Sequence, residues 1–445
     1  MFIPLDNLYD WISSTTPGTI IYRFLPHGSK KLEDITPLDD RSRTQTPWEI
    51  MRQVTMLCHD QEPLDFDRHA KLDWQYVRDL VKHKWTFVAE PQDADLARDF
   101  WQDRASYNMA CMVNHGINDR VLLLHSETNS TEVNKYNNSK FVTAYWWSHA
   151  MIALDWYRFA RYDNRLEFTN LEYQFDFNIY SRAWTGTREY RLFFLQQLAR
   201  TQLHPHSRIT FSGTDGLHHY TRYQFKNTAL AITDDLSNLE ETTNVASSSS
   251  ATYNVTHYQQ CAIDVVLETM FDDNRCHLTE KILRPIACGK PFILVSTPGP
   301  LEFLRKYKFE TFAPWIDESY DSIQDPVERI AAIINSMQIF ADLGPDLKQH
   351  HLIQMQEVAD RNKQHFFSDA FAQHIKDELT TNIDTARQTI LDSYQTGASY
   401  RANRLRMSSQ DKKRLASDSN RWHASSNVRK EIAKLLRECR SRLGR

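Results

Sequence analysis

The chain has 445 residues, is 41% hydrophobic with 23 Phe, 19 Tyr and 11 Trp, and carries a formal net charge of −4. This apolar content can fill the cores of two globular domains and excludes an intrinsically disordered chain. Only 11 Gly, with no Walker A loop and no GxGxxG sequence, argue against a glycine-rich phosphate loop.

The sequence shows no targeting or membrane segment. The N-terminus lacks the basic start and apolar run of a signal peptide, and no segment approaches the roughly 18 uninterrupted apolar residues of a membrane span. The 6 Cys are scattered without the spacing of a disulfide framework or metal site, which fits a reducing compartment. We therefore predict a cytoplasmic protein without a membrane span.

Short apolar runs alternate with helical patterns through the first half, as in α/β domains. Strands are expected at 19–25, 54–59, 86–89 and 120–125, and helices at 6–13, 72–83, 94–108 and 146–161. The apolar run VLLLH leads directly into the polar loop SETNST. Such a loop follows the carboxyl end of a strand, where α/β folds place their chemistry.

A second α/β unit begins near Glu172. Strands are expected at YQFDFNIYS, 208–211, 262–267 and 291–295, with helices at 189–201, 301–307, 325–342 and two within 346–395. The polar stretch 238–252 is expected to be an exposed loop. We predict two facing Rossmann-like α/β domains with a cleft between them, at 1–168 and 169–345. A helical extension at 346–400 and a basic tail at 401–445 follow.

The most informative segment runs from Leu267 to Ser296, LETMFDDNRCHLTEKILRPIACGKPFILVS. It predicts a strand end, an acidic loop and a helix that opens with Thr279 as N-cap. Glu280 and Lys281 then lie in the first turn, where free backbone N–H groups bind phosphate and the lysine adds positive charge. The glutamate can accept hydrogen bonds from sugar hydroxyls, so the segment suits a nucleotide sugar. The alternative is an ordinary helix that begins with Glu and Lys.

LETMFDDNRCHLTEKI followed by GKPFILV resembles the donor-binding motif of the alpha-1,3-fucosyltransferases and their relatives. The resemblance implies a GT-B glycosyltransferase fold and a nucleotide-sugar donor. It also implies that Glu268 and Glu280 hold the ribose or the sugar and that Lys281 holds the diphosphate. Leu267 and Thr269 depart from the Phe and Asn that flank the first Glu in that family.

An inverting sugar transfer needs a base to take the proton of the acceptor hydroxyl. Glu127 in HSETNS and Glu62 in HDQEPLDFD both follow predicted strands. The resemblance supports Glu127, because those transferases carry their base in a strand-end Glu-Ser-Pro motif followed by an aromatic-rich segment. Here Thr128 replaces the Ser and the Pro is absent, so Glu62 stays open. Both residues are equally compatible with solvated loop carboxylates.

The departing diphosphate needs positive charge. Arg188, with Arg182 and Arg191 nearby, lies around a Gly-containing loop between a predicted strand and helix. The resemblance implies a diphosphate-binding Arg at this point of the second domain. The Asp-x-Asp pairs at 65–67 and 93–95 match the metal motif of GT-A enzymes by letter, but neither directly ends a convincing apolar strand. We therefore predict no required metal, with Lys281 and Arg188 supplying the charge.

The C-terminal tail is strongly basic. Residues 401–445 hold 14 Arg and Lys against 4 Asp and Glu, a net charge of +10, so the first 400 residues carry −14. This asymmetry predicts an arm for a polyanion such as DNA; the alternative is a helix that packs on the acidic body. The predicted nucleic-acid contacts are Lys412, Lys413, Arg414, Arg429 and Lys430.

The leading hypothesis is a cytoplasmic glycosyltransferase with a UDP- or GDP-linked donor. Several segments resemble uncharacterised bacterial and phage proteins related to fucosyltransferase-like enzymes. In a phage-infected cell, the acceptor would be a hydroxymethylated base of phage DNA, positioned through phosphate contacts. The alternatives are a glycan-directed, fucosyltransferase-like enzyme and a non-catalytic nucleic-acid-binding protein on a degenerate transferase fold.

Overall fold

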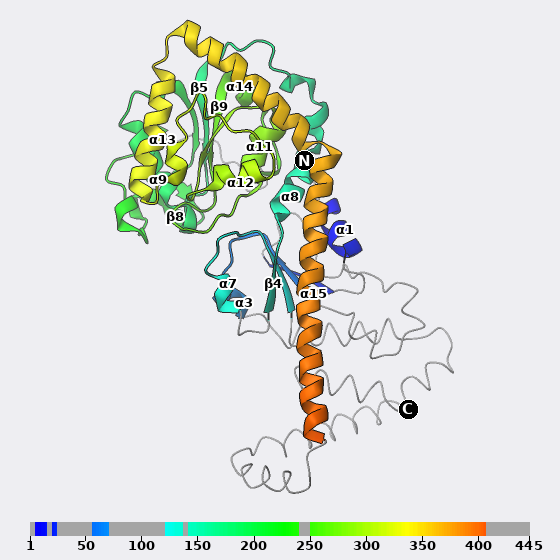
Figure 1. Cartoon of the computed structure of the whole chain (residues 1–445). Coiled ribbons are helices and arrows are strands. Elements are labelled where there is room, and N and C mark those ends of the chain that lie inside the picture. The colour runs from blue at the N-terminus through cyan, green and yellow to red at the C-terminus, as the bar shows by residue number, and fades with distance from the viewer. Residues whose placement is uncertain are drawn as a thin grey trace, which may run out of the picture.

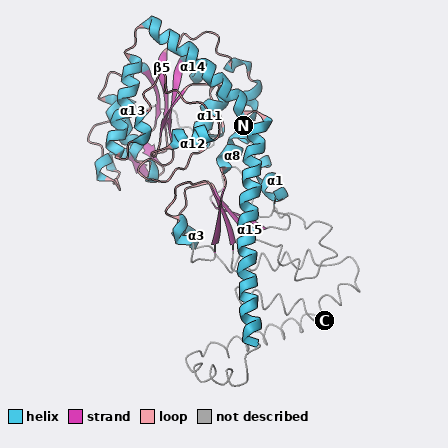
Figure 2. Cartoon of the chain, viewed as in Figure 1, coloured by secondary structure: helices cyan, strands magenta, loops and turns pink. Residues whose placement is uncertain are grey.

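The computed structural model describes residues 5–15, 20–24, 56–70, 121–136, 141–239 and 250–405. Two four-stranded sheets and one two-stranded hairpin make up the β-structure of these residues (Figure 1). Both four-stranded sheets are parallel throughout, and helices pack around them (Figure 2). The described part is therefore an α/β structure with parallel sheets, compatible with the predicted Rossmann-like fold.

The first sheet has the order β1-β2-β3-β4. Its strands are β1 (Ile20–Phe24), β2 (Met56–Asp60), β3 (Val121–His125) and β4 (Phe141–Tyr145). The accompanying helices are α1 (Asp6–Thr15), α3 (Phe66–Ala70), α7 (Val133–Tyr136) and α8 (Ser148–Trp156), with 3₁₀ turns η2 (Arg158–Tyr162) and η3 (Asn164–Leu166). Leu122, Leu123 and Leu124 are all fully buried, as expected for a parallel strand covered on both faces.

The sequence patterns predicted only some of the helices and strands of this first half. The strands expected at 19–25, 54–59 and 120–125 and the helix at 6–13 are confirmed to within a few residues. Strand β4 was not predicted, and the helix expected at 146–161 begins only at Ser148 and gives way to the 3₁₀ turn η2. The elements expected at 72–83, 86–89 and 94–108 lie outside the described residues.

The second sheet has the order β10-β9-β5-β6. Its strands are β5 (Phe175–Ser181), β6 (Ser207–Phe211), β9 (Cys261–Leu267) and β10 (Phe292–Val295). The chain passes from β5 to its neighbour β6 and then returns across β5 to β9. The winding direction therefore reverses between β5 and β9. In open parallel sheets, the crevice at the carboxyl ends of two such strands is the usual ligand site.

Helices lie on either side of this sheet (Figure 1). They are α9 (Tyr190–Ala199), α10 (Val255–Gln260), α11 (Glu280–Cys288), α12 (Pro300–Lys306) and α13 (Pro326–Ala341). Short connecting elements are η4 (Gly186–Arg188), η5 (His204–His206), the hairpin β7 (Thr214–Asp215) and β8 (His218–His219), η6 (Tyr220–Arg222), η7 (Thr228–Leu230), η8 (Ser237–Leu239) and η10 (Ser319–Ser322). The strands and helices expected in this half are confirmed, whereas α10 and the hairpin were not predicted. The stretch expected to be a loop at 238–252 is described only in part.

Two helices follow, as the sequence predicts for 346–395. The first, α14 (Pro345–Phe366), packs on α11 of the second half, and the second, α15 (Asp369–Leu405), runs back along β4 and α1 of the first half (Figure 1). Trp146 Nε1 donates to the carbonyl of Ile375 at 3.0 Å, and Asn382 Nδ2 donates to the carbonyl of Tyr145 at 2.8 Å. The C-terminal helices therefore connect both halves.

The two halves are joined in two further ways. Thr128 and Cys276 form an antiparallel bridge with N–H···O distances of 2.9 and 3.0 Å. One cluster of buried apolar side chains also extends through both halves. It includes Leu122 of β3 and Ile263 of β9. Among the described helices, none combines the length and the apolar character needed to cross a lipid bilayer.

Candidate functional site

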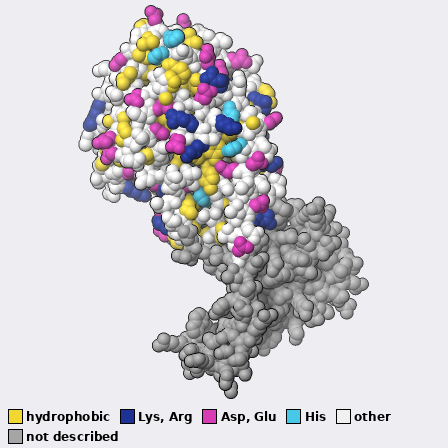
Figure 3. Space-filling model, in the orientation of Figure 1, with side chains coloured by type: hydrophobic (Ala, Val, Ile, Leu, Met, Phe, Trp, Pro, Cys, Tyr) yellow, Lys and Arg dark blue, Asp and Glu magenta, His cyan; other side chains and the backbone are white. Residues whose placement is uncertain are grey.

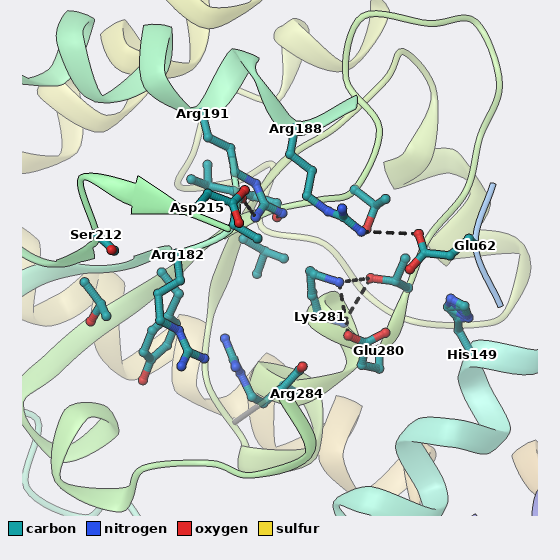
Figure 4. Close-up of a pocket in the computed structure, with 18 of the residues that line it drawn as sticks. Glu62, His149, Arg182, Arg188, Arg191, Ser212, Asp215, Glu280, Lys281 and Arg284 are labelled. Carbon is teal, nitrogen blue, oxygen red and sulfur yellow. Dashed lines mark hydrogen bonds and ion pairs between the residues drawn. The ribbon is translucent and has the colours of Figure 1, made fainter. Parts of the chain in front are cut away.

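A cavity of about 530 Å³ opens at the carboxyl ends of β5 and β9, where the second sheet reverses its winding (Figure 4). The second half lines it with the ends of β5, β6 and β9 and the start of α11. The first half contributes Gln61 and Glu62 after β2, and His149, Ile152 and Trp156 from α8. The volume falls within the range of about 300–1,000 Å³ typical of small-molecule sites.

The charge of the cavity is positive. Its lining holds five basic side chains against three acidic ones, a formal net charge of +2. The basic residues are Arg182, Arg188, Arg191, Lys281 and Arg284, and the acidic residues are Glu62, Asp215 and Glu280. On the face shown in Figure 3, by contrast, acidic and basic side chains are interspersed over the described surface. The cavity therefore favours an anionic ligand.

The start of α11 is built as the sequence predicts. Thr279 is the N-cap, and its side-chain oxygen accepts a hydrogen bond from the backbone N–H of Lys281. The same hydroxyl donates to Glu268 Oε2 at 2.7 Å, and the N–H of Thr279 donates to Glu268 Oε1 at 3.1 Å. Glu268 is fully buried, and this burial raises its pKa. Its carboxylate thus fixes the helix start, and it lies outside the residues that line the cavity.

Glu280 and Lys281 both face the cavity from the first turn of α11. Lys281 Nζ lies 3.0 Å from Glu280 Oε1 and 3.3 Å from Thr279 Oγ1. Burial alone would raise the pKa of Glu280, but the charge of Lys281, the charge of His149 and the hydrogen bond from Lys281 lower it to about 2. Glu280 is therefore ionised at neutral pH and forms an ion pair with Lys281.

The loop after β5 presents the predicted arginines. Asp215 Oδ2 accepts hydrogen bonds from the N–H groups of Trp184 and Thr185, both at 2.8 Å, and so fixes this loop. Gly186 adopts φ +67°, a left-handed conformation that favours glycine. The following residues form η4, which ends at Arg188. From there the Arg188 guanidinium reaches across the cavity to Glu62, at an Nη2–Oε2 distance of 3.3 Å (Figure 4).

The Arg191 guanidinium binds backbone carbonyl groups. It is 3% exposed, and its guanidinium donates to the carbonyls of Ala183 and Leu267, both at 2.5 Å, and of Glu268 at 2.9 Å. These carbonyls follow β5 or end β9, so Arg191 ties together the two strands between which the winding reverses. It lines the cavity, but most of its donors are already used.

The two candidate bases lie in different surroundings. Glu62 lines the cavity and its side chain is 23% exposed. Glu127 is 2% exposed and does not line the cavity. It accepts hydrogen bonds from Leu64 N and Ser130 Oγ, both at 2.6 Å, and from Arg275 Nη1 at 3.1 Å. Burial raises the pKa of Glu127 although Arg275 opposes the shift. The structure thus brings Glu62, but not Glu127, together with Lys281 and Arg188.

His149 and Arg284 are among the lining residues that were not predicted as site residues. His149 lies 3% exposed on α8, with its ring centroid 5.0 Å from that of buried His277. Burial, followed by the charge of His149, lowers the pKa of His277 well below its usual value. Arg284 follows Lys281 by three residues on α11, a spacing that places both on one side of the helix. That spacing was the signal available in the sequence, but the cavity it faces is formed by distant strands.

Metal ligands and the basic tail complete the predicted sites. Within the part of the chain that the structure describes, no group of three or more His, Cys, Asp or Glu side chains is arranged to hold a metal ion. Asp65 precedes and Asp67 lies within α3, outside the lining of the cavity. The pair at 93–95 and the tail residues from 406 onward, with all five predicted nucleic-acid contacts, lie outside the described residues.

No protein-family model, curated protein or solved structure matches this chain. The likeness of segment 267–296 to the fucosyltransferase motif therefore stays a sequence-based prediction. The case for a function depends on the cavity itself: its place at the reversal of the sheet, its positive charge, and a lining drawn from both halves of the molecule.

Proposed function

We propose that this protein is a GT-B-type glycosyltransferase that transfers a sugar from a UDP- or GDP-linked donor to an acceptor hydroxyl. The observation that carries the proposal is the cationic cavity at the carboxyl ends of β5 and β9, whose lining also includes residues of the first half. A nucleotide sugar needs such a site, with positive charge for the diphosphate and an opposing wall for the acceptor.

The donor side is supported by charge and by shape. A nucleotide sugar carries two ionised phosphate groups, and the lining carries a formal net charge of +2. The start of α11 adds backbone N–H groups of the kind that bind phosphate, beside Lys281 and across the cavity from Arg188. Trp156, Tyr180 and Phe211 also line the cavity, and aromatic faces of this kind pack against bases and sugars.

On the acceptor side, Glu62 is the proposed catalytic base. In the proposed reaction, the acceptor oxygen attacks the anomeric carbon, the bond from that carbon to the diphosphate breaks, and Glu62 takes the hydroxyl proton. The basic side chains stabilise the negative charge that develops on the departing diphosphate. We assign the base to Glu62 in preference to Glu127 because Glu62 lines the cavity. Attack opposite the leaving group makes the reaction inverting.

The proposal extends to the acceptor through the sequence. The tail at 401–445 has a net charge of +10, which suits a DNA acceptor held through its phosphates. DNA retention at rising salt, compared between the full chain and a chain ending at residue 400, tests this part. Equal retention would favour a glycan acceptor.

A thermal-shift panel of UDP- and GDP-linked sugars tests the donor. We expect one nucleotide class to raise the melting temperature of the wild type, because a ligand that binds only the folded state stabilises it. The shift should be smaller in Lys281→Ala and unchanged in Lys306→Ala, which removes an exposed lysine of α12 outside the cavity. A folded wild type that no UDP or GDP compound stabilises would overturn the proposal.

A further inference from the structure

Arg284 lines the cavity from α11. It projects from α11 toward β5, where its guanidinium carbon lies 4.3 Å from the centre of the Tyr180 ring. Figure 4 shows Arg284 and Arg182 extending into the same part of the cavity from opposite sides. Thr210 and Ser212, at the end of β6, add hydroxyl groups to the lining. This part of the cavity is therefore rich in hydrogen-bond donors.

Arg284 differs from Lys281, Arg188 and Arg191 in what it binds. Lys281 is paired with Glu280, Arg188 with Glu62, and Arg191 with backbone carbonyls. Within the described residues, Arg284 makes no hydrogen bond and no ion pair, and its Nε is buried without a partner. A guanidinium has five N–H donors, and leaving a buried donor unsatisfied costs about 1–3 kcal/mol. Its donors are available to a ligand.

The carboxylate of Asp264 is engaged by another side chain. Asp264 acts on the charge of Arg284, but it is 1% exposed and accepts a hydrogen bond from Asn178 Nδ2 at 2.6 Å. Burial raises the pKa of Asp264, although the charge of Arg284 opposes the shift. Within the described residues, no carboxylate forms an ion pair with Arg284, so its positive charge faces the cavity without a paired partner.

We propose that Arg284 is the principal ligand of a diphosphate group in this cavity, ahead of Lys281, whose charge Glu280 already balances. The planar guanidinium can bind two phosphate oxygens at once, and Tyr180 keeps it in place beneath the ligand. The identity of the ligand as a nucleoside diphosphate rests on the proposed function, whereas the anion site itself does not.

Isothermal titration with inorganic pyrophosphate, then with UDP and GDP, tests the assignment. At low salt, Arg284→Met should weaken pyrophosphate binding about tenfold or more, as expected for hydrogen bonds to a charged group. Lys281→Met should weaken it only about threefold, in keeping with a solvent-accessible charge. Arg284→Lys should retain part of the affinity. Arg200→Met, which removes an exposed arginine outside the cavity, should bind as the wild type does.

Two results would overturn the assignment: a wild type that does not bind pyrophosphate, or a larger loss in Lys281→Met than in Arg284→Met. Melting temperatures of the ligand-free variants distinguish a lost contact from a lost fold. If pyrophosphate binds through Arg284 but UDP and GDP bind no more tightly and no nucleotide sugar is turned over, the anion site stands and the proposed glycosyltransferase function fails.

Discussion

Arg188 and Glu62 form an ion pair across the cavity, with Nη2 and Oε2 3.3 Å apart and the side chains 24% and 23% exposed. One partner comes from the turn before α9 in the second half, and the other from the loop after β2 in the first. A carboxylate paired with arginine is a weaker proton acceptor, because the positive charge stabilises its ionised form. In the proposed reaction, a diphosphate that attracts Arg188 would weaken this ion pair and make Glu62 a stronger proton acceptor.

This competition predicts that Glu62→Gln tightens nucleoside diphosphate binding while it abolishes sugar transfer. The expected gain is up to about fivefold, since partly exposed pairs are worth about 0.2–1 kcal/mol. Titration calorimetry at low salt measures the affinity. In an Arg188→Met background the same Glu62→Gln change should leave affinity unaltered; an equal gain there would show that the ion pair is not the cause.

Glu127 is expected to serve stability. Its carboxylate accepts hydrogen bonds from Leu64, Ser130 and Arg275, so Glu127→Gln should lower the free energy of unfolding by about 2 kcal/mol and leave nucleotide binding intact. Urea denaturation and calorimetry provide the two measurements. A Glu127→Gln variant of full stability that binds donor but transfers no sugar would instead identify Glu127 as the base.

Replacing Thr279 should lower the free energy of unfolding more than replacing an ordinary N-cap residue does. Thr279→Val removes the cap of α11 and also one hydrogen bond to the buried carboxylate of Glu268, so we expect a loss of about 2–3 kcal/mol. Asp325→Ala removes the cap of α13, where the side chain binds only backbone N–H groups, and should cost about 1 kcal/mol. Equal losses in urea denaturation would contradict the role given to Glu268.

The burial of Lys290 should make the stability of the fold depend on pH. It is 1% exposed, its Nζ lies 3.1 Å from Tyr173 Oη, and burial lowers its pKa from 10.5 to about 7. The unfolded chain therefore binds more protons than the folded chain between those pH values, and stability should rise with pH through this window.

Replacing Lys290 with Met should remove this rise, which we expect to be on the order of 2–4 kcal/mol between pH 7 and pH 10. The packing of Nζ over Phe168 and Tyr173, at 4.1 and 4.2 Å from the ring centres, favours the charged amine and limits the size of the effect. Urea denaturation across pH provides the measurement, with Lys306→Met as the exposed control. A rise that persists in Lys290→Met would assign it to another group.

Features with a local cause were predictable from sequence. The start of α11 follows from Thr279 and the residues after it, and β3 follows from an unbroken apolar run. Strand β4 was missed because its five residues, FVTAY, run directly into the aromatic residues that precede α8. A short strand whose pairing partner lies 20 residues earlier has little local signal of its own.

The site depended on contacts that no local pattern contains. Glu62 and Glu127 both follow strands, and they differ because one meets Arg188, 126 residues away, and the other Arg275, 148 residues away. Arg284 was overlooked for a similar reason. Its helical spacing from Lys281 was visible, but the Tyr180 ring beneath it belongs to a strand more than 100 residues earlier.

The path of α15 has a consequence for how the protein is made. Tyr145, the last residue of β4, and the following Trp146 and Trp147 form hydrogen bonds with residues 375–382 of this helix. Those residues are synthesised long after the strand itself. The N-terminal sheet therefore leaves the ribosome with its aromatic edge uncovered. That edge is covered only after α15 has been synthesised. Such a chain can expose apolar surface to aggregation during translation. A product stopped before residue 369 should need a chaperone or precipitate.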